Sequence, residues 1–161
     1  MLDTKGPEIR TGMLRDNKAI DLVAGQELTI VTDYSLEGDN KKIACSYKDL
    51  PTSVKVGSTI FIADGSLTCE VTEILDGGVK VIVKNDCKLG ERKNMNLPGC
   101  IVNLPTLTEQ DIDDICDFGL KKGIDLIAAS FVRCAEDIET IRDELGPRGA
   151  YIKIIAKIEN Q

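Results

Sequence analysis

The sequence contains no histidine, and this absence narrows the chemistry that the chain can perform. Imidazole is excluded as a general base, a nucleophile or a metal ligand. Neither a Ser-His-Asp hydrolase nor a histidine-ligated zinc site can therefore be built from these residues. Proton transfer would have to fall to carboxylates, lysine, tyrosine, cysteine or water.

The chain also lacks the features of several other protein classes. The net charge is −7 and no long run of lysine or arginine appears, which argues against nucleic acid as a partner. There is no signal peptide, and no apolar run approaches the length of about 18 residues that a membrane span needs. We therefore expect a soluble cytoplasmic protein with no membrane partner. The 161 residues suffice for one domain, or for one domain and part of another.

The cysteines form no recognisable metal or redox motif. No two of them are separated by the short spacing that is typical of a zinc ribbon or a redox pair. Most lie in apolar stretches, where cysteine behaves as a small core side chain. The six are Cys45, Cys69, Cys87, Cys100, Cys116 and Cys134.

Short runs rich in valine, isoleucine and threonine, broken by turn residues, fill the chain from about residue 9 to residue 102. Apolar residues recur at every second position in Val79–Lys84 and Leu28–Ile30, which predicts strands with one buried face. Asp76-Gly77-Gly78 predicts a hairpin that joins Leu67–Leu75 to Val79–Lys84. Many short strands with frequent turns indicate a small antiparallel β-barrel or sandwich.

The spacing of apolar residues changes near residue 104, from the alternation of strands to the spacing of helices. Thr108-Glu109-Gln110-Asp111 has the form of a capping box, and apolar residues then recur at helical spacing. Asp125–Phe131 is almost continuously apolar, as in a parallel strand that is buried on both faces. A second amphipathic helix ends at Gly146-Pro147, and Tyr151–Ile158 is predicted to be another strand. The order α-β-α-β is the repeat of a parallel α/β fold.

Two such repeats cannot close an eight-stranded barrel, which typically needs about 250 residues. We therefore expect the chain to be a fragment of a longer protein. The strand Asp125–Phe131 would then lack neighbours on both sides. For the segment from Leu104 to Gln161 we expect poor order, exchange with another copy, or edge-to-edge pairing, so a purely structural role stays open as an alternative.

Side chains that suit a phosphoryl group gather in two segments far apart in the sequence. Leu2-Asp3-Thr4-Lys5-Gly6-Pro7-Glu8-Ile9-Arg10-Thr11-Gly12 holds carboxylate, hydroxyl, ammonium and guanidinium groups close together. Lys153-Ile154-Ile155-Ala156-Lys157-Ile158-Glu159-Asn160 places Lys157 and Glu159 two apart, so on a strand both would point to the same side. An ammonium beside a carboxylate suits a phosphoryl group and its divalent ion, although a lone pair of this kind also fits an ordinary surface ion pair.

These two segments and Arg92-Lys93-Asn94-Met95-Asn96-Leu97-Pro98-Gly99 between them resemble the pyruvate kinase family, in the same order along the chain. The resemblance covers essentially the whole sequence. It implies a TIM-type (β/α)₈ barrel that is interrupted after its third strand by a small β-barrel lid, the B domain. Residues 1–6 would then be the end of a barrel strand, residues 7–103 the lid, and residues 104–161 a partial barrel (A domain).

The resemblance implies a kinase that transfers the phosphoryl group of phosphoenolpyruvate to ADP, giving pyruvate and ATP in glycolysis. It implies Mg²⁺ (or Mn²⁺) and K⁺ as cofactors, and a homotetrameric, cytoplasmic parent enzyme. The chain alone would be inactive, and its own oligomeric state stays open. The alternative is a stand-alone nucleotide- or phosphate-binding β-barrel module without catalysis, against which the lack of a Gly-rich P-loop or Rossmann fingerprint argues.

The resemblance also assigns residues to the site in the barrel part. Lys157 matches the lysine that neutralises the phosphoryl group in flight, which agrees with catalysis by charge stabilisation. Glu159 matches one carboxylate ligand of Mg²⁺, and a second ligand is implied outside this sequence. Asp3 and the backbone carbonyl of Thr4 match ligands of K⁺. Glu8 is similar to a glutamate of the K⁺-dependent members.

Three residues of the lid are assigned to the nucleotide or the phosphate. Arg10 matches an arginine that contacts the transferring phosphate or the nucleotide, for which its fork geometry is suited. Lys93 matches a lid lysine that reaches the nucleotide phosphates when the lid closes. Asp64 matches a lid aspartate near the cleft, although an Asp-Gly turn between strands explains it equally well.

In the barrel part, Phe131 resembles a residue of the active-site floor, and core packing explains Phe131 equally well.

Overall fold

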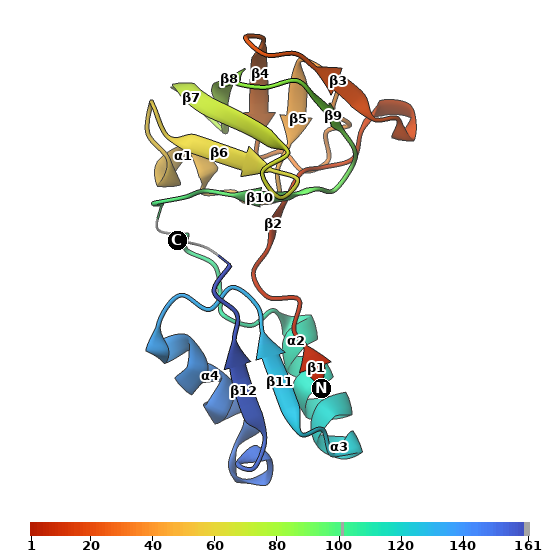
Figure 1. Ribbon diagram of the computed structural model, residues 1–161, viewed down its shortest axis with the longest axis vertical. Helices are drawn as coiled ribbons and strands as arrows, with labels where there is room; N and C mark the ends of the chain where they lie inside the picture. The colour runs from red at the N-terminus through yellow and green to blue at the C-terminus, as the bar shows by residue number, and fades with distance from the viewer. Residues whose placement is uncertain (101, 160–161) are drawn as a thin grey trace. The chain divides into compact units, whose positions relative to one another are not determined.

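The computed structural model describes residues 1–100 and 102–159. The chain divides into two compact units, one formed by Ile9–Asn103 and the other by Met1–Glu8 together with Leu104–Gln161 (Figure 1). The second unit therefore combines the two ends of the sequence, and each unit is described by itself.

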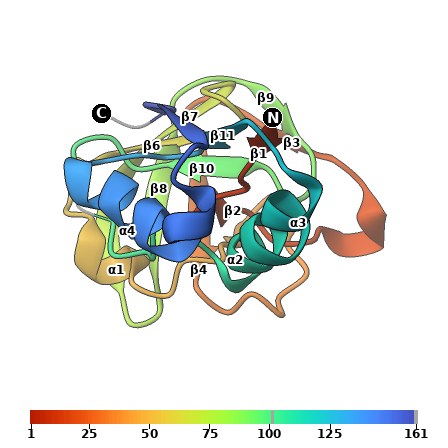
Figure 2. The same cartoon turned by 90° about the horizontal axis from the view of Figure 1, so that it is seen from below.

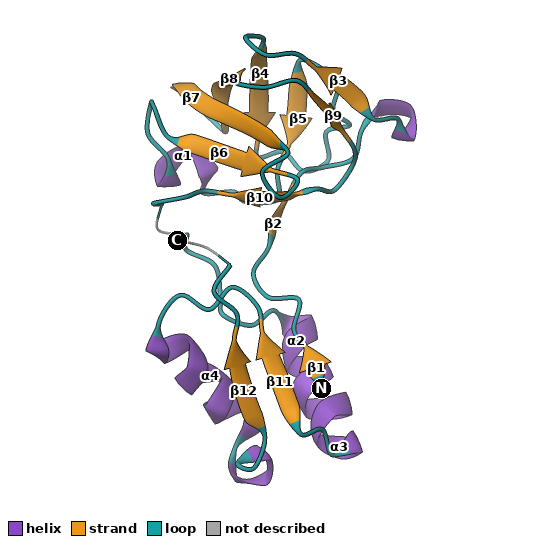
Figure 3. Ribbon diagram, in the orientation of Figure 1, coloured by secondary structure: helices purple, strands orange, loops and turns teal. Residues whose placement is uncertain are grey.

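The unit Ile9–Asn103 is a β-structure (Figure 3). Over the described residues its main sheet has seven strands in the order β2-β10-β6-β7-β8-β4-β5. These are β2 (Ile9–Arg10), β4 (Glu27–Val31), β5 (Lys42–Ala44), β6 (Thr59–Ile62), β7 (Leu67–Leu75), β8 (Gly78–Val83) and β10 (Asn94–Asn96). The other elements are the strand pair β3 (Ile20–Leu22) and β9 (Cys87–Leu89) and the short helices η1 (Arg15–Asn17) and α1 (Leu50–Ser53).

The predicted hairpin is confirmed. Strands β7 and β8 pair antiparallel across a turn that contains Gly77, whose φ of 80° lies in the left-handed region that glycine adopts most readily. Val79, Val81 and Val83 of β8 are completely buried, as their alternation with other residues predicted.

One strand pairing departs from the predicted antiparallel sheet. β4 and β5 run parallel, with Ile30 opposite Ile43, whereas every other neighbouring pair in this sheet is antiparallel over the described residues. Parallel neighbours need a crossover connection, which residues 32–41 supply. Thr11 and Cys45, just beyond the two edge strands, form an antiparallel bridge, so the sheet curls until its edges meet. The prediction of an antiparallel barrel is therefore wrong in this pairing, and the curled sheet is mixed.

The second unit is an α/β structure. Its sheet is parallel, in the order β1-β11-β12, and Figure 2 shows the longer helical segments on the same side of these strands. The strands are β1 (Leu2–Asp3), β11 (Leu126–Ala129) and β12 (Lys153–Ala156). The helical segments are α2 (Glu109–Asp113), the π-helix η2 (Asp114–Gly119), α3 (Leu120–Lys122), α4 (Ala135–Leu145) and η3 (Pro147–Gly149). No helix within the described residues has the length and apolar character to cross a membrane.

Strand β11 has a neighbour on each side, since Ile127 pairs with Leu2 of β1 and with Ile154 of β12. The expectation that Asp125–Phe131 lacks neighbours is therefore wrong. The first residues of the sequence supply one of the two, and a contact this distant leaves no mark on the local pattern. The prediction of a parallel strand is itself confirmed.

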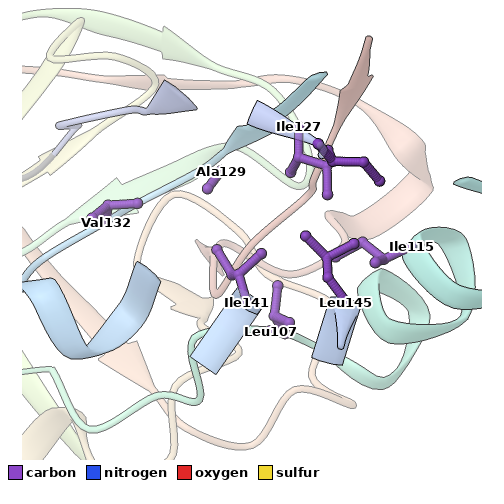
Figure 4. Close-up of a cluster of buried hydrophobic side chains, with 8 residues drawn as sticks. Leu107, Ile115, Ile127, Ala129, Val132, Ile141 and Leu145 are labelled. Atoms are coloured by element: carbon purple, nitrogen blue, oxygen red, sulfur yellow. The ribbon is translucent and has the colours of Figure 1, made fainter. Parts of the chain in front are cut away.

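A hydrophobic cluster joins the helices to the sheet (Figure 4). Ile127 and Ala129 of β11 meet Ile115, Ile141 and Leu145 of the helical segments. Ile127, Ile115 and Ile141 are completely buried. Burial of a side chain of this size contributes about 1.5–3 kcal/mol, so this cluster is a major source of stability for the α/β unit.

Buried carboxylates lie near the start of two helices in this unit. The predicted capping box is confirmed, because Thr108 Oγ1 accepts a hydrogen bond from the Asp111 N–H and the Asp111 carboxylate accepts one from the Thr108 N–H. In the first turn of α4, Asp137 is 4% exposed and accepts hydrogen bonds from the N–H and guanidinium of Arg133 and from the Thr106 hydroxyl.

Replacing Asp137 with asparagine is expected to lower the free energy of unfolding at pH 7 by about 1–3 kcal/mol, because buried donors lose a charged acceptor. Burial alone raises the pKa of Asp137, but the hydrogen bonds from Arg133 and Thr106 outweigh burial and hold that pKa well below its usual value. A depressed folded-state pKa gives stability that is complete above the unfolded pKa of about 4 and is lost as the pH falls through the folded value.

Urea unfolding of the chain as a function of pH measures this effect. The difference between wild type and Asp137→Asn should shrink as the pH falls below about 4. Asp143→Asn, at an exposed position of the same helix, is the matched control and should follow wild type throughout. If the difference in the free energy of unfolding between wild type and Asp137→Asn stayed constant down to acid unfolding, the stabilising role of the Asp137 carboxylate would be contradicted.

Candidate functional site

The predicted site residues from the two ends of the sequence meet at one edge of the parallel sheet. Asp3 is the last residue of β1 and Thr4 follows it, while Lys157 comes directly after β12. Since the three strands are parallel, their carboxyl ends lie at the same edge. In α/β sheets this edge is where ligands bind.

Lys157 is the centre of the charged contacts at this edge. Its Nζ lies 2.7 Å from Asp3 Oδ1 and 3.9 Å from Glu159 Oε1, and its side chain is 29% exposed. The hydrogen bond with Asp3 raises the pKa of Lys157, and the negative charges of Glu159 and Glu8 add to this rise against the opposing effect of burial. Lys157 is therefore a fixed positive charge at neutral pH.

The sequence predicted that Lys157 and Glu159 lie on a strand, but β12 ends at Ala156, before both residues. The hydrogen bonds between neighbouring segments nevertheless continue for one more residue. Lys157 N–H donates to Ala129 O at 2.9 Å, and Val132 N–H donates to Lys157 O at 3.0 Å. The predicted proximity of the two charged groups is therefore present, but the loop conformation after β12 produces it.

Glu159 is held by the backbone of Phe131. Phe131 N–H donates to Glu159 Oε2 at 3.0 Å, and the backbone of Phe131 is left-handed with φ of 57°. A non-glycine residue in this region costs of order 1–3 kcal/mol, so the surrounding contacts must impose it. Phe131 thus reaches the site through its N–H, and the sequence carries no signal for that role.

Ser130 is a site residue that the sequence analysis did not single out. It is 6% exposed, and its Oγ contacts Thr4 O at 2.5 Å and lies 3.4 Å from Asp3 Oδ1. Ser130 N–H donates to Thr4 Oγ1 at 3.0 Å, and Thr4 N–H donates to Ala128 O at 3.0 Å. The available signal was a hydroxyl at the end of a buried apolar strand, where a polar group needs a partner.

The oxygen atoms at this edge suit hard cations, and the Lys157 ammonium suits phosphate oxygens. The Asp3 carboxylate contacts the Lys157 ammonium, and the Ser130 hydroxyl lies beside both this carboxylate and the Thr4 carbonyl. Oxygen ligands fit K⁺ and Mg²⁺ in charge and hardness. Within the described residues no group of three or more His, Cys, Asp or Glu side chains gathers around a possible metal position.

Arg10 and Lys93 lie close together in the unit Ile9–Asn103. Arg10 Nη1 donates to the backbone carbonyl of Arg92 at 2.8 Å. Lys93 N–H donates to Thr11 Oγ1 at 2.8 Å, and Thr11 N–H donates to Lys93 O at 2.7 Å. The pairing of β2 with β10 thus brings the backbone segments of two cationic residues side by side, although they are far apart in the sequence.

Asp64 lies in the turn between β6 and β7 of the same unit. Its N–H donates to Asn94 Oδ1 at 3.0 Å, its Oδ1 accepts from Asn94 Nδ2 at 2.7 Å, and its backbone is left-handed with φ of 55°. Asx residues tolerate this conformation, so these contacts explain Asp64 as a turn residue.

Comparison with known proteins links this arrangement to one family. The model of the pyruvate kinase barrel domain matches residues 1–161. The chain is 56% identical over 160 residues to the pyruvate kinase of Eimeria tenella, an overlap that covers 99% of this chain and 30% of that protein. It is 51% identical to the cytosolic isozyme of pyruvate kinase from Glycine max, with 100% of this chain and 32% of the relative covered.

Solved structures agree with the sequence comparison. A crystal structure of pyruvate kinase from Cryptosporidium parvum has a TM-score of 0.91 and 53% identity, and covers 99% of this chain and 34% of its own. A structure of the Cryptosporidium parvum enzyme in complex with ADP has a TM-score of 0.88. The chain spans about a third of the length of these relatives. By sequence and by fold, the chain belongs to the pyruvate kinase family.

Proposed function

We propose that the protein containing this chain transfers the phosphoryl group of phosphoenolpyruvate to ADP, giving pyruvate and ATP. The observation that carries the proposal is the meeting of Asp3 with Lys157, beside Glu159, at the carboxyl edge of the parallel sheet. The close relatives are named pyruvate kinases, and we therefore assign the pyruvate kinase reaction to this cluster.

The chemistry of phosphoryl transfer suits a positively charged side chain that is fixed in place. The transition state spreads negative charge over the equatorial oxygens, so positioning and charge stabilisation supply most of the catalysis. Lys157 is kept protonated and oriented by Asp3 and would donate hydrogen bonds to the phosphoryl oxygens. No proton transfer by Lys157 is needed.

Two kinds of cation fit the oxygen atoms around Lys157. Glu159 would hold Mg²⁺ or Mn²⁺ together with ligands from outside the chain, and its orientation is set by the Phe131 N–H. The Asp3 carboxylate and the Thr4 carbonyl would hold K⁺, with the Ser130 hydroxyl nearby. When bound, these ions supply positive charge that offsets the charge of the phosphoryl group.

We assign the unit Ile9–Asn103 to the lid, the B domain, and the other unit to part of the (β/α)₈ barrel. The support is the geometric division after Glu8 and after Asn103, which lies within two residues of the boundaries expected at residues 6–7 and 103–104. Arg10 and Lys93, on adjacent segments of the lid, would bind the phosphates of the nucleotide. Asp64 would lie near this nucleotide, because its side chain is hydrogen-bonded to Asn94, the residue after Lys93.

We also propose a location and an assembly for the whole protein. We place it in the cytoplasm because relatives at about 50% identity are named cytosolic isozymes. A homotetramer is expected from the family resemblance alone. The net charge of −7 of this chain gives no reason to expect nucleic acid as a partner of these residues.

A pyruvate-forming assay on the full-length protein tests the proposal. We expect turnover that needs both phosphoenolpyruvate and ADP, depends on Mg²⁺ or Mn²⁺, and is faster in KCl than in NaCl of equal ionic strength. Absence of pyruvate formation by a correctly folded full-length protein would contradict the proposal. A rise in melting temperature with Mg·ATP that Lys93→Ala abolishes would in that case indicate a nucleotide-binding module.

A further inference from the structure

Asp111 makes contacts that exceed the needs of a helix cap. Its carboxylate is 1% exposed and accepts hydrogen bonds from the Thr108 N–H at 2.9 Å and the Thr108 hydroxyl at 2.7 Å. The same carboxylate also accepts from Lys5 N–H at 2.8 Å and from Gly6 N–H at 3.2 Å. The last two bonds tie the start of α2 to the residues that follow β1, across more than a hundred positions of sequence.

The bond from Lys5 fixes the direction of a carbonyl group in the site. The Lys5 N–H and the Thr4 C=O belong to one peptide group, and the described chain has no cis peptide bonds. In a planar trans peptide the N–H and C=O point in opposite directions. When Asp111 Oδ1 holds the N–H, the Thr4 carbonyl is therefore aimed away from α2, where Ser130 Oγ contacts it.

The backbone at Gly6 makes the second bond possible. Gly6 has φ of +67°, and a Cβ there would lie 2.9 Å from Ser130 Cβ and 3.0 Å from Ser130 O. Only glycine can adopt this conformation so close to the neighbouring strand end. The turn directs the Gly6 N–H to Asp111 Oδ2, so both carboxylate oxygens hold the same short segment.

We infer that Asp111 is a positioning residue for the monovalent-cation site, which it serves by orienting the Thr4–Lys5 peptide. The inference rests on the proposed function, which gives the Thr4 carbonyl to K⁺. Asp111 also polarises this peptide, because an N–H that donates to a carboxylate leaves its carbonyl oxygen more negative. A cation ligand is thus aimed and strengthened by a side chain that does not touch the cation.

Asp137 is a matched comparison within the same unit. It too is a buried carboxylate in the first turn of a helix, 4% exposed against 1% for Asp111. Its hydrogen bonds go to Arg133 and Thr106, and none that the structure describes goes to residues 2–6. A purely structural role for Asp111 therefore predicts that removing either carboxylate has the same kind of effect.

The test compares Asp111→Asn with Asp137→Asn in the full-length protein. Asparagine keeps the size of the side chain but replaces one acceptor oxygen with an amide group that cannot accept an N–H. Two quantities are measured: the rise in melting temperature caused by KCl relative to NaCl without substrates, and the K⁺ concentration that gives half-maximal pyruvate formation. Should Asp111→Asn fail to fold, Asp111→Ser keeps a single acceptor oxygen and takes its place.

We expect Asp111→Asn to raise the half-maximal K⁺ concentration by about tenfold or more, as the loss of a group that orients a metal ligand does elsewhere. The K⁺-specific rise in melting temperature should shrink with it. Asp137→Asn should lower the melting temperature in both salts and leave both K⁺ responses at the wild-type value.

Two results would overturn the inference: wild-type K⁺ responses in folded Asp111→Asn, or equal changes in both variants. If wild type itself shows no K⁺ response in either measurement, the proposed cation site at Asp3 and Thr4 fails as well. Failure of the cation site can be told apart from failure of the Asp111 inference, because it appears in wild type before any variant is compared.

Discussion

Replacing Lys157 with methionine in the full-length protein is expected to lower kcat for pyruvate formation by about a thousandfold, the size of loss seen when a transition-state charge partner is removed. Methionine keeps an unbranched side chain of similar length, but it lacks the ammonium that Asp3 orients at 2.7 Å. The KM for ADP should change little, since the lost interaction concerns the phosphoryl group in transfer.

Lys153→Met is the matched control for this variant. Lys153 lies at the start of β12, the strand that Lys157 directly follows, and is exposed. The Lys153→Met change removes the same charge from the same part of the chain but not from the site, so activity should stay near that of wild type. Measurement of both melting temperatures separates catalysis from folding. A Lys157→Met variant that keeps more than about a tenth of the wild-type kcat would contradict the assigned role.

The 161-residue chain by itself is expected to form no pyruvate above the uncatalysed rate, while the full-length protein turns over under the same conditions. Mg²⁺ loses its bound water reluctantly and needs several oxygen ligands in near-octahedral geometry. Within the described residues no three His, Cys, Asp or Glu side chains gather at one possible metal position, and Glu159 alone supplies too few oxygen atoms. Without the divalent ion, Lys157 alone would offset the charge of the phosphoryl group, and only in part.

This comparison requires evidence that the chain is folded. Hydrogen exchange should show protection of Ile127, which is completely buried in the central strand β11 between two neighbours. With that protection present, absence of turnover reports on the incomplete site. Mg²⁺-dependent turnover by the chain, removed by Lys157→Met, would show instead that these residues suffice.

Features of the fold that depend on local pattern were predictable from the sequence. Alternation identified β8, the Asp-Gly signal identified its turn, and Thr108 with Asp111 identified the start of α2. Each follows from the chemistry of residues a few positions apart. The π-helix η2 inside the predicted first helix and the parallel pairing of β4 with β5 did not follow, because alternative backbone registers and strand directions share one apolar pattern.

The site was predictable to a smaller extent. Lys157, Asp3 and Glu159 were named from the family resemblance, and the structure brings all three together. Nothing in the local sequence indicates that β1 pairs with β11, which creates the contact. The roles of the Phe131 N–H and of Ser130 also arise from long-range contacts and from backbone conformation. Lys157 and Glu159 lie close together, although the predicted reason, a shared strand, is wrong.

The most direct measurement is a crystal structure of the full-length protein with phosphoenolpyruvate and Mg²⁺ in the absence of ADP. We expect Lys157 Nζ within about 3 Å of a phosphoryl oxygen. We also expect a Glu159 carboxylate oxygen about 2.1 Å from Mg²⁺. A phosphoryl group bound elsewhere, with Lys157 still paired only to Asp3 and Glu159 away from the metal, would contradict the proposed site.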